Sequence, residues 1–277
     1  ALGYGSDNQG LYQEFWPADL HLIGKDILRF HAVYWPALLM AAGIPLPRQI
    51  FAHGWWTKEG EKMSKSKGNV LDPFEAADYY GTDQLRYFLL REVPFGQDGD
   101  FSDAAMVRRA NEDLANDLGN LLNRTLSMQR KYLGEEVGPP VVRSDEDADL
   151  KALVAGLPEE YEEHMGGLRF HRALEAVFDV VRRGNLYVDE TAPWILNKEG
   201  HTERLREVLA NLVEAVRVAV LHLWPFMPEA CDRMLEQMGY SIEGKELDAD
   251  AVWGARPEAL TILKPKPVFQ KVEEPAE

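Results

Sequence analysis

Helical periodicity in the second half of the chain most constrains the fold. Apolar side chains recur there at intervals of three and four residues, as in amphipathic helices. The predicted helices cover residues 102–134, 147–165, 167–184, 202–224 and 228–239. Short connections between long helices are typical of an antiparallel bundle. The inner face of the first helix is predicted to hold Val107, Leu114, Leu118, Leu121, Thr125 and Met128.

The first half of the chain has a different character. Residues 18–24 read as a buried strand that ends in a glycine, residues 25–42 as a helix, and residues 47–56 as a second strand. A strand, a helix and a strand within about 35 residues indicate a βαβ unit of a parallel sheet. Pro36 lies inside the predicted helix and should kink or break it. One such unit is less than a complete doubly wound sheet.

Two shorter helices are predicted between these halves. Asp72 is expected to cap the first, which has Pro73 at its first position and stops at Gly81. The second covers residues 82–93 with Thr82 as its cap. Turn residues are concentrated in 94–102, which we interpret as a domain boundary.

Composition narrows the classes of function. The 277 residues carry a net charge of −16, which argues against nonspecific binding of nucleic acid. Local basic sites are still compatible with this charge. With Cys231 as its one cysteine, the chain can form neither an internal disulfide nor a cysteine-based zinc site, which fits a reducing compartment. No apolar run reaches the roughly 18 residues that a membrane span needs.

Residues 58–68, "KEGEKMSKSKG", place lysines among small polar residues. A lysine ammonium is a point charge on a flexible stem, and it can follow a polyphosphate whose charge moves during a reaction. Stabilising charge that develops only in the transition state accelerates that reaction. A solvated hairpin without a specific role is the alternative for a charge run of this kind.

The letters "KMSKS" match the second signature of the class I aminoacyl-tRNA synthetases. The segment that follows, "GNVLDPFEAADYYGTDQLRYFLL", resembles the continuation in the methionine, valine, isoleucine, leucine and cysteine members. Upstream, "HLIGKDILRFHAVYWPALLMAAGIPLPRQIFAHGWW" closely resembles the bacterial methionyl members. The pieces "GNLLNR" and "APWILNK" agree with them too. The resemblance covers residues from about 16 to about 235.

The resemblance implies an α/β region followed by an all-α region. The first would be the C-terminal half of a Rossmann-like class I catalytic domain with its loop-bearing connecting domain, and the second an antiparallel helical bundle that binds the anticodon. The implied parts are the half-sheet at 1–56, the loop and connecting helices at 57–98, the bundle at 99–240, and a tail at 241–277 that packs back on the core.

The implied reaction joins methionine to ATP, giving methionyl-adenylate and pyrophosphate, and then transfers the methionyl group to tRNA(Met). ATP would enter with Mg²⁺. The resemblance assigns the catalytic loop residues as Lys62, Ser64, Lys65 and Ser66. It assigns ATP binding to Gly24, Asp26, His53, Trp56 and Lys65.

Methionine binding is assigned by the same resemblance to Asp26, Ile27, His31 and Trp35. The chemistry agrees, because a thioether is apolar, polarizable and favourable beside aromatic rings. The position after a strand end also agrees, since open α/β sheets bind ligands there. An amphipathic helix with a satisfied core histidine is the alternative for His31, and a strand-end hydrogen bond is the alternative for His53.

Anticodon recognition is assigned by resemblance to Asn120, Arg124 and Trp194. An amide, a guanidinium and an indole supply the hydrogen bonds and the stacking by which single-stranded RNA bases are recognised. Residues 120 and 124 lie one helical turn apart, and they are expected to face solvent. Without the resemblance, the pair would read as a solvated face and Trp194 as a core residue.

The first class I signature, His-x-Gly-His, is missing from this sequence. We therefore expect a C-terminal portion that is inactive by itself, with an unpaired sheet edge and exposed apolar surface in residues 1–56. Any zinc would be bound by residues before position 1, and no metal site is expected here. A cytoplasmic monomer is expected. Two rivals stay open: another class I synthetase, of the valine, leucine, isoleucine or cysteine type, and a non-catalytic tRNA-binding remnant.

Overall fold

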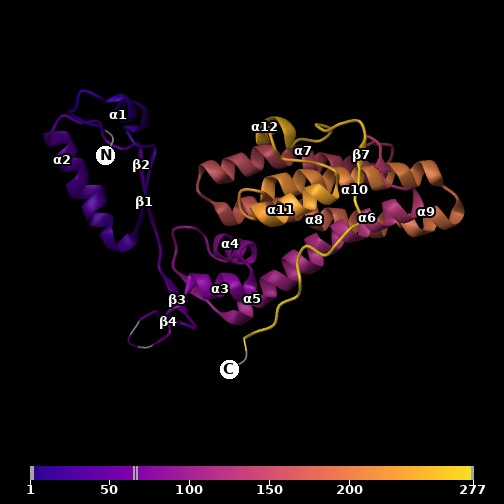
Figure 1. Cartoon of the computed structure of the whole chain (residues 1–277), viewed down its shortest axis with the longest axis horizontal. Helices are drawn as coiled ribbons and strands as arrows, with labels where there is room; N and C mark the ends of the chain where they lie inside the picture. The colour runs from indigo at the N-terminus through magenta and orange to yellow at the C-terminus, as the bar shows by residue number, and fades with distance from the viewer. Residues whose placement is uncertain (1–2, 65, 67, 276–277) are drawn as a thin grey trace. The chain divides into compact units, whose positions relative to one another are not determined.

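The computed structural model describes residues 3–64, 66 and 68–275, which form two compact units. The first unit combines Ala1–Asn69 with Phe95–Phe101, and the second combines Val70–Pro94 with Ser102–Glu277 (Figure 1). The fold class predicted from the sequence, α/β followed by all-α, is confirmed. The four-part division of the chain stays a prediction, although residues 95–101 join the first unit rather than the loop region or the bundle.

The first unit is built on two parallel strands. Strand β1 (Leu20–Gly24) pairs with β2 (Gln49–His53) so that Leu20 lies opposite Gln49 and Gly24 opposite His53. A short helix, α1 (Gly10–Phe15), precedes them. The predicted βαβ unit is therefore present. The strand predicted at 47–56 is in fact two, because the chain leaves β2 before residue 54 and enters β3 at Trp56.

The helix predicted at 25–42 is continuous from Lys25 to Ala41 but changes its type along the way. A 3-10 turn, η1 (Lys25–Ile27), is followed by a π-helical segment, η2 (Phe30–Tyr34), and then by α2 (Trp35–Ala41). Pro36 lies inside this helix, two residues after the π segment, where its missing N–H interrupts the regular hydrogen-bond pattern. Much of this segment's apolar surface is exposed, as expected: Phe30 is 58% and Leu38 65% exposed.

A second small sheet carries the lysine hairpin. Strand β3 (Trp56–Lys58) pairs with β4 (Glu61–Lys62) antiparallel and with β5 (Gly99–Phe101) parallel. The two turn residues between β3 and β4 both have positive φ, which matches the twist of a tight hairpin. The stretch 94–102, interpreted as a domain boundary, contains β5, and the chain passes from one unit to the other after Pro94 and again after Phe101. Gly54 is required beside it, because an added Cβ would lie 2.1 Å from the Gln97 carbonyl oxygen.

The second unit begins with two short helices. Asp72 caps α3 (Pro73–Tyr80) as predicted, since its carboxylate accepts from the amides of Phe74 and Glu75. Helix α4 (Thr82–Arg91) follows directly. The cap predicted at Thr82 is wrong, because the N-cap is Gly81 and no side chain caps this helix. The φ of 94° at Gly81 explains why glycine suits that position.

A helical bundle forms the rest of this unit (Figure 1). The helix predicted at 102–134 is continuous from Asp103 to Tyr132, but a π segment divides it. Helix α8 is longer than the predicted 167–184 and has Gly184 in its interior. The bundle's elements are α5 (Asp103–Arg109), η3 (Ala110–Gly119, π), α6 (Asn120–Tyr132), α7 (Asp145–Gly166), α8 (Phe170–Thr191), α9 (Pro193–Glu199), α10 (Thr202–Leu223) and α11 (Pro228–Gln237).

Helix α10 is the centre of the bundle. Every residue from Glu207 to Leu223 is buried, and α10 contacts α6, α7, α8, α9 and α11. A helix whose apolar residues cover most of its circumference is expected to lie in a core. Two of the buried polar side chains of α10, Glu214 and Arg217, are paired with one another.

The weakly patterned C-terminal stretch has regular structure of its own. It contains α12 (Leu247–Asp250) and β7 (Leu260–Thr261), and β7 pairs antiparallel with β6 (Glu136–Val137). Leu260 and Ile262 are buried against the bundle core. In the described part of the chain, no helix has the length and the apolar character needed to cross a membrane.

Candidate active site and nucleic-acid interface

The carboxyl ends of β1 and β2 meet at Gly24 and His53, which are register partners. Asp26 folds back onto this edge, because a Cβ added at Gly24 would lie 2.5 Å from Asp26 Oδ1 and 3.8 Å from His53 Cε1. The carboxyl edge of a parallel sheet is where α/β proteins bind ligands. The structure therefore brings Gly24, Asp26 and His53 together.

Two hollows divide the predicted site residues. One, of about 640 Å³, is lined by β1 residues together with Phe30, His31 and Trp35. The other, of about 560 Å³, is lined by Asp26, Trp55, Trp56, Thr57, Lys62, Met63 and Asp98. His31 and Trp35 thus share one hollow, which also has apolar residues of β1 in its lining, and Asp26, Trp56 and Lys62 share the other. Ile27 lines neither of the two.

Hydrogen bonds of the two histidines define which ring nitrogens are engaged. Nδ1 of His31 lies 3.0 Å from the Ile27 carbonyl oxygen, one helical turn earlier. Nδ1 of His53 lies 2.9 Å from the Gly54 carbonyl oxygen, as the strand-end alternative predicts. A carbonyl accepts, so each Nδ1 is the donor in its hydrogen bond.

The side chain of Asn69 ties the two ends of the lysine loop together. Its Oδ1 accepts from the Ser64 amide at 2.8 Å, and its Nδ2 donates to the Lys62 carbonyl at 3.2 Å. The hydroxyls of Ser64 and Ser66 are 2.8 Å apart. Lys65, the main catalytic prediction, lies outside the described residues.

Three residues that the sequence did not reveal, Lys25, Trp55 and Asp98, contact one another and form one wall, of which Trp55 and Asp98 line the same hollow as Lys62. Nζ of Lys25 lies 2.5 and 2.6 Å from the two carboxylate oxygens of Asp98, which also accepts from the Trp55 amide at 2.9 Å. The Lys25 hydrogen bond holds the pKa of Asp98 below its usual value. Nζ of Lys25 and Lys62 lie 4.2 and 5.4 Å from the centre of the Trp55 ring. The pairing of Lys25 with Asp98 spans 73 residues, so no local pattern could reveal it.

The predicted RNA-contacting residues lie on helices that contact one another, since α6 packs against α9. Asn120 is exposed, and Arg124 reaches across to Asp189 near the end of α8, with 3.5 Å between the charged atoms. Trp194 lies in the first turn of α9, directly after Pro193, and is 42% exposed. The alternative of a core tryptophan is therefore wrong. An amide, a guanidinium and an indole are available at one surface.

Metal ligands are not clustered in the described ranges. No group of three or more His, Cys, Asp or Glu side chains there could hold a metal ion. The one cysteine, Cys231, is buried, and burial raises the pKa of its thiol well above the usual value.

A parallel strand edge, a lysine loop and a following helical bundle together define a class I aminoacyl-tRNA synthetase architecture. A family profile described as "tRNA synthetases class I (M)" matches residues 2–126. A second profile, described as "Anticodon binding domain of methionyl tRNA ligase", matches residues 140–277. The chain belongs to the methionyl-tRNA synthetase family.

Individual relatives agree with this assignment. The chain is 49% identical over 244 residues to a methionine–tRNA ligase of Clostridium acetobutylicum, covering 88% of this chain and 38% of the relative. It is 45% identical over 276 residues to that of Bacillus subtilis, covering 99% and 41%. The Mycobacterium tuberculosis methionyl-tRNA synthetase in complex with methionyl-adenylate superposes with a TM-score of 0.90 at 47% identity, covering 96% of this chain and 53% of that one. The chain spans about two fifths of the length of these curated relatives.

Proposed function

We propose that the chain is the C-terminal part of an enzyme that activates methionine with ATP and transfers the methionyl group to tRNA(Met). The observation that carries the proposal is the shared hollow of Asp26, Trp56 and Lys62 in the unit whose two parallel strands end at Gly24 and His53. It combines an anion, an aromatic edge and a cation where an α/β sheet binds ligands.

In the first step, the methionine carboxylate would attack the α-phosphate of ATP and release pyrophosphate. The ammonium of Lys62, together with Lys65, would stabilise the charge that develops on the phosphates, and ATP would enter as its Mg²⁺ complex. The carboxylate of Asp26 would accept from the methionine ammonium or the ribose. The methionyl group would then pass from the adenylate to the terminal ribose of tRNA.

The hollow that His31 and Trp35 share supports methionine as the substrate. Trp35 and Phe30 offer aromatic faces, and Nε2 of His31 offers a polar atom beside them. A thioether gains from contact with aromatic rings, whereas a branched aliphatic side chain gains burial alone. This distinction separates the proposal from a synthetase for valine, leucine or isoleucine.

Recognition of the CAU anticodon is proposed for the bundle surface of Asn120, Arg124 and Trp194. The exposed indole supports it, because stacking a base on an aromatic ring contributes roughly 1–3 kcal/mol. Specific contacts at this surface are compatible with a net charge of −16, since they depend on local placement.

Methionine-dependent exchange of pyrophosphate into ATP tests the catalytic proposal. We expect no exchange by the chain alone, and exchange by a fusion that carries the upstream residues of the Bacillus subtilis relative. Replacing Lys62 and Lys65 by alanine in the fusion should abolish that exchange. Exchange by the chain alone would refute its proposed incompleteness. A folded fusion that activates valine or leucine in place of methionine would refute the substrate.

The remaining parts of the proposal concern the oligomeric state, the cellular compartment and bound zinc. We propose a monomer that works in the cytoplasm, consistent with its single buried cysteine. Any zinc would be held by residues before position 1. Sedimentation analysis of the fusion tests the monomer, and metal analysis of the same sample tests the zinc.

A further inference from the structure

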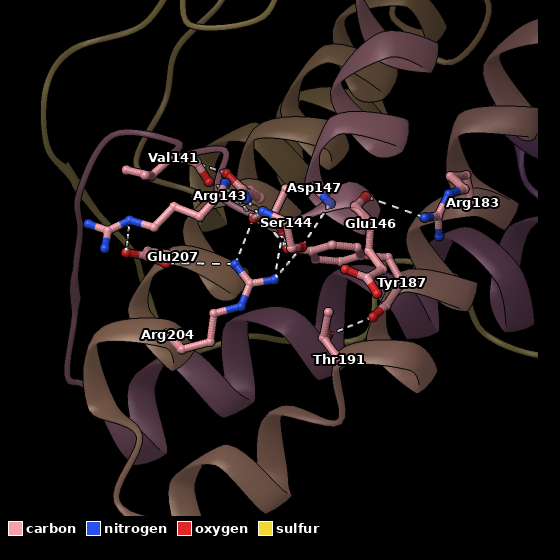
Figure 2. Close-up of polar contacts among 11 residues, drawn as sticks. Val141, Arg143, Ser144, Glu146, Asp147, Arg183, Tyr187, Thr191, Arg204 and Glu207 are labelled. Carbon is pink, nitrogen blue, oxygen red and sulfur yellow. Dashed lines mark hydrogen bonds and ion pairs between the residues drawn. The ribbon is translucent and has the colours of Figure 1, made fainter.

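The carboxylate of Asp147 is completely buried and accepts hydrogen bonds from three directions. Arg204 donates to both of its oxygens, at 2.6 and 2.8 Å, and the Tyr187 hydroxyl donates to Oδ1 at 2.5 Å. The amides of Arg143 and Ser144 donate to Oδ2. Burial alone would raise the pKa of Asp147, but these hydrogen bonds hold it well below its usual range. Asp147 is therefore an ionised carboxylate, and each of its two oxygens accepts hydrogen bonds from more than one donor (Figure 2).

The two side-chain donors come from either side of the segment that carries Trp194. Tyr187 lies in the last part of α8, which ends at Thr191. Arg204 lies in the first turn of α10, which begins at Thr202. One carboxylate on α7 thus holds both ends of residues 188–203, the segment in which α9 presents its indole.

The attachment of the α8 end is reinforced by neutral hydrogen bonds. The Asn211 amide exchanges two hydrogen bonds with the backbone of Val141, at 2.7 and 2.9 Å, and lies 3.4 Å from the Tyr187 hydroxyl. The Thr191 hydroxyl donates to the Tyr187 carbonyl at 2.6 Å and closes the last turn of α8 (Figure 2). Tyr187 is itself completely buried, so its hydroxyl has a fixed position.

Helix α9 packs against α6 and α10, and the conformation of its first residues also depends on where α8 ends. It is seven residues long, and its N-cap, Ala192, has a left-handed φ of 42°. Such a conformation costs about 1 kcal/mol or more for a residue other than glycine, and it persists where the surroundings fix it. Pro193 is buried while Trp194 and Ile195 are exposed. The angle at which the indole meets solvent therefore depends on how the two ends of the segment are held, in addition to the contacts of α9 with α6 and α10.

We infer that Asp147, Tyr187 and Arg204 are positioning residues that fix Trp194 in the orientation in which it stacks on an RNA base. The inference rests on the proposed recognition of the CAU anticodon by this surface. A buried charged network is weak evidence for stability, because apolar replacements are often as stable. The network joins α7, α8 and α10 at the two ends of the segment that carries Trp194. Fixing the orientation of that segment accounts for it better than a contribution to stability does.

The test uses two variants of the network and one control. Tyr187→Phe removes the hydrogen bond from the tyrosine hydroxyl to Asp147. Arg204→Lys keeps the positive charge but removes the paired hydrogen bonds of the guanidinium to the two oxygens of Asp147. The matched control is Tyr87→Phe, since Tyr87 is also fully buried and its hydroxyl donates to Asp113 at 2.7 Å, between α4 and η3. Each full-length variant is labelled with 5-fluorotryptophan, and the Trp194 resonance is assigned with Trp194→Phe.

Two readouts separate positioning from general stability. The first is the affinity for an RNA hairpin with a CAU loop. The second is the fluorine resonance of Trp194. We expect Tyr187→Phe and Arg204→Lys to lower this affinity by about tenfold, within the roughly 1–3 kcal/mol that stacking a base on an aromatic ring contributes, and to shift or broaden the resonance. Tyr87→Phe should leave both unchanged at an equal loss of melting temperature.

An unchanged affinity and resonance in both network variants would overturn the inference, as would equal changes in the control. A failure of the anticodon proposal would give another result. The wild-type chain would then show no preference for a hairpin with a CAU loop over one with a CAC loop. The Trp194 resonance would still decide whether the network fixes the indole.

Discussion

The carboxylate of Glu214 and the guanidinium of Arg217 form an ion pair with 2.7 Å between their charged atoms, and neither side chain is exposed to solvent. Arg217 also donates to the carbonyls of Asp250 and Val252, and Glu214 accepts from the Gly254 amide. Nε of Arg256 lies 2.9 Å from Glu214, at ion-pair distance but without hydrogen-bond geometry. The pair therefore fastens the C-terminal stretch to the central helix of the bundle.

Glu214→Gln should destabilise the bundle strongly. Removing one partner of a buried pair leaves an uncompensated charge, which costs about 3–5 kcal/mol. The free energy of unfolding, measured in urea, checks this. The control is Asp179→Asn, since Asp179 and Arg182 form a pair with the same helical spacing but about half exposed side chains. Its expected cost is below about 1 kcal/mol. Equal losses would contradict the buried pair's importance.

Gly184 and Gly156 should respond oppositely to alanine. Both lie inside helices, where alanine is intrinsically favoured by about 1 kcal/mol. A Cβ at Gly156 meets nothing within 4 Å, so Gly156→Ala should stabilise. A Cβ at Gly184 would lie 2.9 Å from Leu121 Cδ2, and overpacking of this kind costs about 1–3 kcal/mol. Gly184→Ala should therefore lower the urea midpoint. A rise in both variants would disprove close packing of α6 and α8.

Stability should fall as His222 is protonated. Burial lowers the pKa of His222 below its ordinary value of 6.5, and Arg217 lowers it further, although the hydrogen bond to the Val218 carbonyl acts in the opposite direction. The unfolded chain then binds the proton more readily, so the free energy of unfolding decreases as pH falls below 6.5.

Histidine NMR titration checks this directly. The histidine signal that His222→Phe removes should keep its neutral shift as the pH falls through 6.5. The variant should also lose part of the dependence of stability on pH below 6.5. His201→Gln, at an exposed position, is the control that should leave both unchanged. A His222 signal titrating at or above 6.5 would contradict the prediction.

Trp194→Ala should weaken binding of a CAU hairpin RNA roughly tenfold or more, because a base loses its stacking partner. Asn120→Ala and Arg124→Ala should reduce the preference for CAU over other loops. Ile195→Ala is the matched control, since Ile195 is the neighbouring exposed apolar residue on α9. Fluorescence anisotropy with labelled hairpins measures all four. If all three site variants keep the affinity for CAU and the preference for it over other loops, the anticodon does not bind at this surface.

Asp98→Asn should loosen the lysine hairpin. The change removes the charge that holds Lys25 and weakens the contact to the Trp55 amide. Trypsin should then cut after Lys58 and Lys62 several times faster, as mass spectrometry of timed digests would record. Asp19→Asn is the control, because it breaks a highly exposed pair with Arg48 in the same unit. Equal cleavage rates in the two variants would show that Asp98 does not restrain the hairpin.

Local patterns predicted the helices of the bundle well and the sheet less well. The helix predicted at 202–224 and the cap at Asp72 depend on neighbours in sequence, and both are confirmed. Helix α8 continues past the predicted end at Gly184 to Thr191, and in the fold Gly184 allows close approach to Leu121. Strand β5 was missed because its pairing with β3 lies about 40 residues away in sequence.

The sequence by itself determined the fold class, the family and the types of side chain at both sites, because periodicity and motif spacing are properties of neighbouring residues. The tertiary structure alone decided that Lys25, Trp55 and Asp98 form one wall. It also decided that Asp147 holds both ends of the Trp194 segment. Hydrogen bonds between residues 40 to 73 positions apart leave no periodic trace, since they exist only once distant elements have packed together.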